Sequence, residues 1–478
     1  MTSALNSDKA ACRKANRRVS VFLGALLSAV TVAAVYTQPA NAQSQPLVDA
    51  LTSAYMNNPT LLARRARLRS TDEGVPQALS NWRPDVSMSL DGGYSDVENT
   101  NGTGSARNQW RNSSGYSFDV SQPLFRGGRT LAATSQAENS VRAERARLLG
   151  VEQTILLDAI SAYMDVFRDE AVLNLNINNE QVLSRQLEAT RDRFEVGEIT
   201  RTDVHQAEAR LAQAKADRIQ SEGDLEASRA GYLNVVGEPA PGGLVAPDLP
   251  DELPDTKEAA LKISAVKSPL VIGAEFDRLA AFDNADEVWG ELLPELDLTA
   301  GYSSAFEGAA EQGRIDTAEI ALSLSIPIYQ QGTVYSRLRE ARQDAAERAF
   351  TVDEQRRVAI ETASRAWEAL QTAKARVVSF QAQIEANVVA LEGVQREASV
   401  GSRTVLDVLD AEQEMLDSRV SHVRARRDEM VATYEVMSAL GQLTARDLKL
   451  PVTLYDPREH YQEVREKWFG GNASGDGQ

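Results

Sequence analysis

The chain consists of two similar halves that are related by a constant offset of 204 residues. Glycines, prolines and polar residues recur at this spacing: Gly197 with Gly401, Thr200 with Thr404, Asp203 with Asp407, Pro123 with Pro327, and Gly237 with Gly441. A period this long does not describe a solenoid, whose repeats span about 20–50 residues. The fold is therefore expected to contain two copies of one unit of roughly 200 residues.

The N-terminus has the pattern of an export signal. Four basic residues between positions 13 and 18 precede an apolar run from Val19 to Val35, and Ala40-Asn41-Ala42 follows. We predict a secretory signal peptide over residues 1–42. An uncleaved membrane anchor is the alternative, and the short apolar run disfavours it. Cys12, the only cysteine, precedes the apolar run, where a lipid-attachment cysteine would not lie.

The charge and the hydropathy of the chain restrict its partners. The formal net charge is −18 at pH 7, which argues against nucleic acid, because phosphates are bound by Lys/Arg-rich surfaces. After the signal peptide no run of 18 apolar residues occurs, so we expect no transmembrane helix. An exported chain of this kind is expected to cross a membrane only as a β-barrel.

Each half contains two stretches in which apolar and polar residues alternate. Val86, Met88 and Leu90 alternate with Ser87 and Ser89. Similar alternation reappears at 116–121, 296–300 and 320–326. A period of two predicts strands with one apolar and one polar face. We therefore expect one strand hairpin at about 84–124 and a second at about 294–327.

Long stretches without proline follow each hairpin and predict helices at about 128–193 and 332–398. Each would be roughly 100 Å long at the α-helical rise, a length typical of coiled coils and bundles. Shorter return helices are expected at 202–236 and 405–440. Repeat 1 then covers 43–237 and repeat 2 covers 257–450. The rest comprises a Pro/Gly-rich linker at 238–256 and a C-terminal tail at 451–478, poorly ordered from Asp456 onward.

Four strands per chain cannot close a membrane barrel, because even small ones need about eight. Oligomerisation resolves the problem. Three chains would supply twelve strands for one β-barrel, and their long helices would close an α-helical barrel beneath it. The predicted fold class is an α+β membrane protein that forms a homotrimer: a 12-stranded β-barrel continuous with a 12-helix α-barrel of antiparallel coiled-coil helices.

Several motifs carry a resemblance to a known family. They are Val400-Gly-Ser-Arg-Thr-Val-Leu-Asp-Val-Leu-Asp410, Ser438-Ala-Leu-Gly441, Gln122-Pro-Leu-Phe-Arg-Gly-Gly128 and Ile326-Pro-Ile-Tyr-Gln-Gln-Gly332. From about residue 46 to 450 the chain resembles the TolC family of outer-membrane exit ducts. The resemblance implies a homotrimer in outer-membrane lipid with its helical tunnel in the periplasm. It also implies a periplasmic adaptor and an inner-membrane ABC exporter or proton-driven pump as partners.

No motif predicts an enzyme or a cofactor. His205, His422 and His460 are scattered and lack the spacing of a metal site. His205 corresponds to Leu409 in the other repeat, so we expect it to be packed in the helical seam. Neither a phosphate-binding glycine loop nor a nucleophile elbow is recognisable.

The informative polar residues cluster at the two predicted helix turns. Gly197 and Gly401 mark the turns. Thr200 with Asp203, and Thr404 with Asp407, have the spacing of capping boxes, in which an acid satisfies free N–H groups at a helix start. That role alone is sufficient to explain both acids. Asp410 differs, because it lies one helical turn further on, its counterpart is Gln206, and no cap requires it.

The family resemblance implies two functions for these turns. Asp407 and Asp410 would line the periplasmic entrance, where three copies of each form a six-carboxylate, cation-selective constriction. Mutual repulsion there should raise some of their pKa values. Arg403 would bind Thr202 and Asp203 and hold the entrance closed, unless it is an ordinary solvated arginine. Ala398 stands where a tyrosine would supply another link, so the gate is expected to be weaker.

Three functions fit these features. The first is a passive exit duct for type I protein secretion, which the missing lipid-attachment cysteine favours. The second is a duct for multidrug efflux, which would use the same walls. The third is a periplasmic coiled-coil adaptor, which would not need strands with an apolar outer face.

Overall fold

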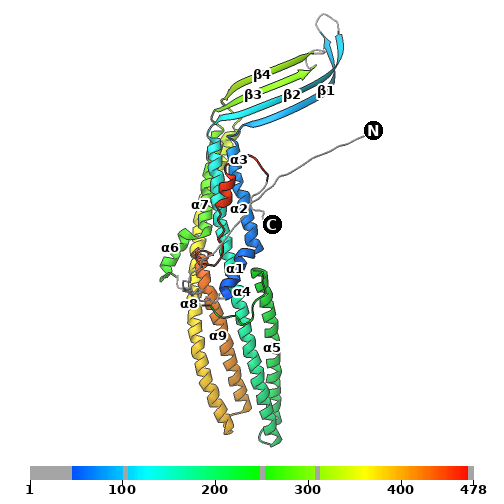
Figure 1. The fold of residues 1–478 in the computed structure, drawn as a ribbon. Coiled ribbons are helices and arrows are strands. Elements are labelled where there is room, and N and C mark those ends of the chain that lie inside the picture. Colours follow the sequence, from blue (N-terminus) through cyan, green and yellow to red (C-terminus); the bar gives the residue numbers. More distant parts are fainter. Residues whose placement is uncertain (1–45, 101–105, 248–252, 307–312, 472–478) are drawn as a thin grey trace, which may run out of the picture. The chain divides into compact units, whose positions relative to one another are not determined.

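The computed structural model describes residues 46–100, 106–247, 253–306 and 313–471, and the predicted signal peptide lies outside these ranges. Helices and strands follow one another in the same order twice, as Figure 1 shows. Short helices lead into a hairpin, and a long helix and a shorter return helix follow it. The expected hairpins and long helices lie within two residues of the observed bounds.

The long helices are α4 (Arg129–Glu195) and α8 (Thr333–Ser399), each of 67 residues. Their return helices are α5 (Arg201–Val236) and α9 (Val405–Ala439). Each return helix is about half as long as its partner. The half of each long helix that lies nearest the strands therefore needs another neighbour.

The short helices supply that neighbour. In repeat 1 they are α1 (Pro46–Asn57), α2 (Pro59–Asp72) and α3 (Gly74–Ser80), and in repeat 2 they are α6 (Lys257–Lys267) and α7 (Pro269–Gly290). The hydroxyl of Ser53 donates to the carbonyl of Val236 at 3.2 Å, and the Asn58 amide donates to that of Val235 at 2.9 Å. These bonds satisfy carbonyls at the end of α5 that have no partner within the helix.

The four strands form one antiparallel sheet in chain order: β1 (Asp85–Thr100), β2 (Ala106–Arg126), β3 (Glu295–Phe306) and β4 (Arg314–Ser325). The β2–β3 pairing joins the two repeats. Its register shifts between Pro123 and Phe125, where proline has no N–H to donate to the ladder. Strands β1 and β4 are the two edges of the sheet.

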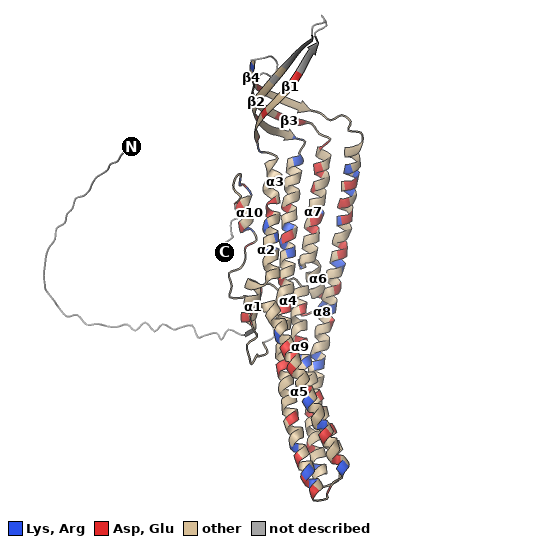
Figure 2. Cartoon of the chain, turned by 90° about the vertical axis from the view of Figure 1, so that its right-hand side faces the viewer, with Lys and Arg blue, Asp and Glu red and all other residues tan. Residues whose placement is uncertain are grey.

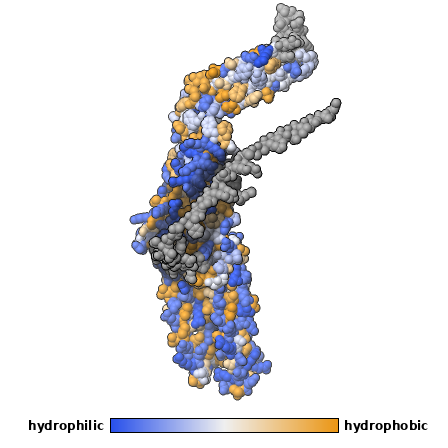
Figure 3. Space-filling view, viewed as in Figure 1, coloured by the Kyte–Doolittle hydropathy of each residue, from blue (hydrophilic) through white to orange (hydrophobic). Residues whose placement is uncertain are grey.

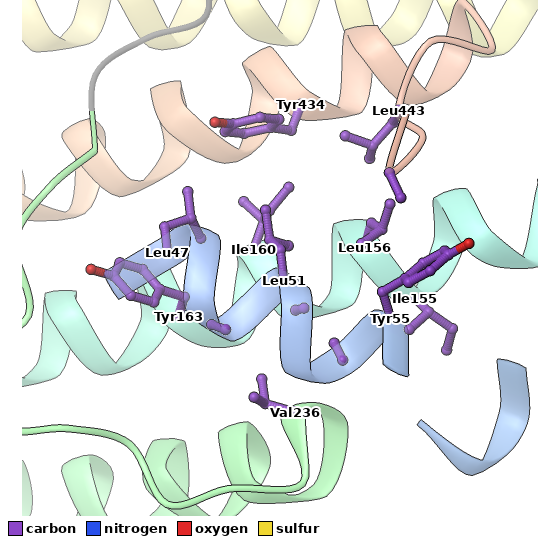
Figure 4. Close-up of a cluster of buried hydrophobic side chains, with 14 of the residues drawn as sticks. Leu47, Leu51, Tyr55, Ile155, Leu156, Ile160, Tyr163, Val236, Tyr434 and Leu443 are labelled. Atoms are coloured by element: carbon purple, nitrogen blue, oxygen red, sulfur yellow. The ribbon is translucent and has the colours of Figure 1, made fainter. Parts of the chain in front are cut away.

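The main hydrophobic core lies where α1 meets α4, α9 and the end of α5, as Figure 4 shows. Leu156, Ile160 and Tyr163 of α4 are fully buried there. The hydroxyl of Tyr163 donates to the carbonyl of Val245 at 2.9 Å, which holds the described part of the linker against α4.

The expectation of a poorly ordered tail from Asp456 onward is wrong for residues 456–471. This segment forms the short helix α10 (Glu459–Val464) and packs against α2. His460 and Val464 are buried, and the Arg465 guanidinium lies 3.3 Å from the Glu138 carboxylate. The charged composition of the tail suggested disorder, but its charges and aromatic rings have partners on α2 and α4.

None of the described helices combines the length and the apolar composition that crossing a membrane requires.

Candidate functional site

Each helix turn is closed by a glycine in the left-handed conformation. Gly197 and Gly401 both have a φ of +81°, which a side chain rarely adopts. The N–H of Glu198 donates to the carbonyl of Arg193 at 2.9 Å, and that of Ser402 to the carbonyl of Glu397 at 3.0 Å. These bonds satisfy the last carbonyls of α4 and α8, as in a Schellman motif. The chain therefore reverses direction within a few residues.

Both capping boxes are present, which confirms the prediction from spacing. The N–H of Thr404 donates to Oδ2 of Asp407 at 2.8 Å, and the N–H of Asp407 donates to the Thr404 hydroxyl at 3.2 Å. Thr200 and Asp203 make the same pair of bonds at 2.8 and 3.4 Å. The two helix starts are therefore built alike.

The cap also determines the ionisation of Asp407. Hydrogen bonds from the backbone and then the hydroxyl of Thr404, together with the nearby Arg403 guanidinium, lower the pKa of Asp407. This direction is opposite to the increase expected from mutual repulsion among three copies. Within one chain no second copy repels Asp407, so the hydrogen bonds to its charged form set the direction.

Arg403 contacts its own turn. Its Nε donates to Oε2 of Glu397 at 2.9 Å, and its Nη1 lies 3.9 Å from Oδ1 of Asp407. Within the described part of one chain, neither a hydrogen bond nor an ion pair joins Arg403 to Thr202 or Asp203. The link between the two turns therefore stays a prediction for the assembled protein.

Asp410 has a partner that the sequence did not predict. Nη2 of Arg210, on α5, donates to Oδ1 of Asp410, on α9, at 2.5 Å. At this level α5 and α9 pack through Ala207, Val405 and Leu409. Because residues 200 positions apart form the pair, only a prediction that α5 and α9 are neighbours would have revealed it.

The expectation that His205 is packed is wrong. Its side chain is 60% exposed, and its Nδ1 lies 3.0 Å from Oε2 of Glu208. The buried residues of α5 at this level are Val204 and Ala207. The helical seam therefore runs along slightly different positions in the two repeats. A residue that is buried in one repeat, such as Leu409, can have an exposed counterpart 204 residues away, such as His205.

The sheet has two chemically different faces. One row across all four strands consists of Val86, Val120, Ala300 and Ile320. The next row, which lies on the opposite face, consists of Ser87, Asp119, Gly301 and Glu319. Large apolar side chains on the first face are exposed in a single chain, among them Met88, Leu90, Ile320, Leu322 and Leu324.

In Figure 3 apolar residues gather on the part of the sheet nearest the helices. Figure 2 shows acidic and basic residues distributed along the helices down to the turns. Figure 1 shows that the turn between α4 and α5 and the turn between α8 and α9 lie at the ends of the helices remote from the sheet.

Comparisons with known proteins agree with this architecture. Residues 50–238 and 261–442 match the family model described as outer membrane efflux protein. The chain is 34% identical to the outer membrane efflux protein BepC of Brucella suis, over 90% of this chain and 92% of the relative. It is 24% identical to the outer membrane protein TolC of Escherichia coli, over 85% of this chain and 84% of the relative.

The solved structure of the outer-membrane channel OprN has a similar fold. It superposes with a TM-score of 0.71 at 20% identity, covering 83% of this chain and 90% of the other. The two regions that match the family model, residues 50–238 and 261–442, include all four strands as well as the long helices and their return helices.

Proposed function

Because this chain belongs to the outer membrane efflux protein family, we propose that it works as a homotrimeric duct that gives proteins or small molecules a passive exit path from an inner-membrane transporter to the outside. The protein is an outer-membrane channel and not an enzyme.

The two-faced sheet is the observation that carries the duct. Its exposed apolar rows suit lipid, and its polar rows suit a water-filled interior, the alternation that membrane barrels use. One chain leaves β1 and β4 as open edges. In a trimer, β1 of each chain would pair with β4 of its neighbour, and twelve strands would close. A periplasmic adaptor would have no use for such a face.

The helices would continue the duct into the periplasm, with the turns at its entrance. There Asp407 and Asp410 would form a ring of acids, and Arg403 would bind Thr202 and Asp203 of a facing turn. Partners of the duct would be a periplasmic adaptor and an inner-membrane ABC exporter or proton-driven pump. This arrangement is supported by the position of both turns at the end remote from the sheet.

For cargo we propose type I protein secretion, with small-molecule efflux as the second candidate. Relatives are named for both: a proteases secretion protein and an alkaline protease secretion protein on one side, a pyoverdine export outer membrane protein on the other. Efflux is favoured by the relative with 34% identity, which is named an outer membrane efflux protein. Secretion is favoured by the absence of a lipid-attachment cysteine.

Two experiments test these proposals. Membrane fractionation should recover heat-sensitive trimers from the outer membrane, whereas soluble periplasmic material would refute the duct. In a deletion strain, the proteins of the culture supernatant and the susceptibility to toxic compounds should be measured together. Loss of specific secreted proteins at unchanged susceptibility would support secretion, and the reverse would support efflux.

A further inference from the structure

The C-terminal residues 451–471, here called the strap, run beside α1, α2 and α3 toward the sheet. Three contacts join the strap to residues 55–83, and they follow one another in the same direction along both stretches of chain. The N–H of Tyr455 donates to the Tyr55 hydroxyl at 3.0 Å. Nδ1 of His460 lies 3.2 Å from Oδ2 of Asp72. Figure 1 shows α10, in red, beside these helices.

The third contact brings the strap to the base of the sheet. Nη1 of Arg83 donates to the carbonyl of Lys467 at 2.8 Å. Arg83 lies two residues before Asp85, the first residue of β1. Its guanidinium also lies 4.9 Å from the centre of the Trp468 ring, a cation–π geometry. Arg83 therefore holds Trp468 at the level where the strands begin.

Contacts with α4 fix the strap from its other side. The hydroxyl of Tyr461 donates to Oε1 of Glu138 at 3.2 Å, and Nη2 of Arg465 lies 3.3 Å from the same oxygen. Val464 is 2% exposed. The strap is thus a packed element up to the residues that precede Trp468.

The end of the strap carries two aromatic rings that the described part of the chain leaves largely exposed. Trp468 is 58% exposed and Phe469 is 87% exposed. Trp82 and Trp289, which lie just before β1 and β3, are also partly exposed, at 36% and 47%. Aromatic residues concentrate at the two water–lipid interfaces of membrane barrels, where an apolar ring with a polar N–H or O–H is favoured.

We propose that Trp468 and Phe469 insert into the periplasmic interface of the outer membrane, so that the strap anchors the C-terminus to lipid. The proposal rests on the outer-membrane placement of the sheet. Lipid is the occupant because the two rings lie at the end of the sheet where its exposed apolar rows begin. Arg83 acts as the positioning residue, through its bond to the Lys467 carbonyl and its contact with Trp468.

Site-directed spin labelling tests the anchor. The only cysteine of the chain, Cys12, lies in the predicted signal peptide, so single cysteines can be introduced by Phe469→Cys, Leu322→Cys and Glu466→Cys. Trimers with one labelled position per chain are reconstituted in liposomes, and the collision rates of the label with oxygen and with a water-soluble nickel chelate are measured. For the label at 469 we expect the ratio of the oxygen to the nickel collision rate to exceed that of a water-exposed label at least several-fold, as for the label at 322. The label at 466, where the side chain is 86% exposed, should favour nickel.

The outcomes separate the alternatives. A label at 469 that favours nickel would mean that the strap ends in water, and a label protected from both reagents would mean that it packs against protein. Either result overturns the anchor. If the label at 322 favours nickel, the membrane placement of the sheet fails instead. Adding Arg83→Ala to the Phe469→Cys chain should shift the label toward nickel, and an unchanged ratio would remove Arg83 from the proposal.

A second measurement keeps both rings in place. Lipids brominated near the headgroup should quench the tryptophan fluorescence of the unaltered trimer more than that of Trp468→Phe. Equal fractional quenching in the two proteins would contradict insertion of Trp468.

Discussion

Asp410 is bound within its own chain by Arg210, whereas Asp407 is bound by the cap of its own helix. This difference decides what each acid can contribute to an entrance ring. An exposed ion pair contributes little to stability, but it places a cation directly beside a carboxylate in the proposed constriction.

The first prediction concerns the two acids. Asp407→Ala combined with Asp410→Ala should abolish the cation preference of the channel and its block by multivalent cations, because rings of acids select cations. Asp410→Ala alone should show part of the effect, since that residue has no capping role. The reversal potential in a salt gradient measures this. An unshifted reversal potential in the double variant would show that the acids face away from the pore.

The second prediction concerns Arg210. Its removal by Arg210→Ala should leave Asp410 without its counter-ion and therefore increase the cation preference, opposite to the effect of losing the acids. Arg191→Ala is a matched control, because Arg191 is also ion-paired near the turn, with Glu208 at 2.7 Å. Equal shifts of the reversal potential in the two variants would indicate a general charge effect and contradict a specific role for Arg210.

The third prediction concerns the link between turns. Arg403→Ser should raise the single-channel conductance in planar bilayers, and Asp203→Ala should act in the same direction. Their combination should be non-additive, because both remove one shared contact. Glu397→Gln, which alters only the bond seen within the turn, is the control. If Glu397→Gln reproduces the Arg403→Ser result, Arg403 acts through its own turn and the link is refuted.

At the scale of elements, the sheet offers a direct comparison of its faces. Leu298 and Leu322 are paired on the apolar face, and Asp297 and Ser323 are paired on the other. We predict that Leu322→Arg blocks trimer assembly, at a cost of roughly 2–4 kcal/mol near the bilayer midplane. Ser323→Arg should be tolerated, because it would face water. Heat-sensitive trimers on gels provide the measurement, and equal damage from both substitutions would contradict the assigned faces.

Much of the element structure was predictable, because local patterns determine it. Alternation located the strands, the absence of proline located α4 and α8, and the Thr404–Asp407 spacing located a helix start. Contacts between distant segments were not predictable. The Arg210–Asp410 pair depends on how α5 lies against α9. The exposure of His205 depends on which residues of α5 face the other helices, here Val204 and Ala207. The prediction that the tail is poorly ordered failed for a related reason, because the order of this segment comes from contacts with distant residues such as Asp72 and Glu138.

At the scale of the whole molecule, the strap stabilises the fold through contacts with helices of repeat 1. Removing residues 456–478 would expose the surface that Val464 and His460 cover, and burial of one valine side chain contributes about 1.5–3 kcal/mol. We predict that the truncated trimer dissociates at a lower temperature than the full chain. Glu466→Ala, at an exposed position, should leave the dissociation temperature unchanged. An unaltered temperature after truncation would contradict a structural role for the strap.

The two open edges of the sheet have a consequence for the supply of this protein in the cell. A newly exported chain exposes unpaired backbone groups along β1 and β4 beside an apolar face, and such edges pair readily with other chains. Correct closure needs three chains to meet, so its rate should rise steeply with their local concentration, whereas wrong pairing needs only two. The rate of synthesis and the number of periplasmic chaperones would therefore limit how many ducts a cell can build.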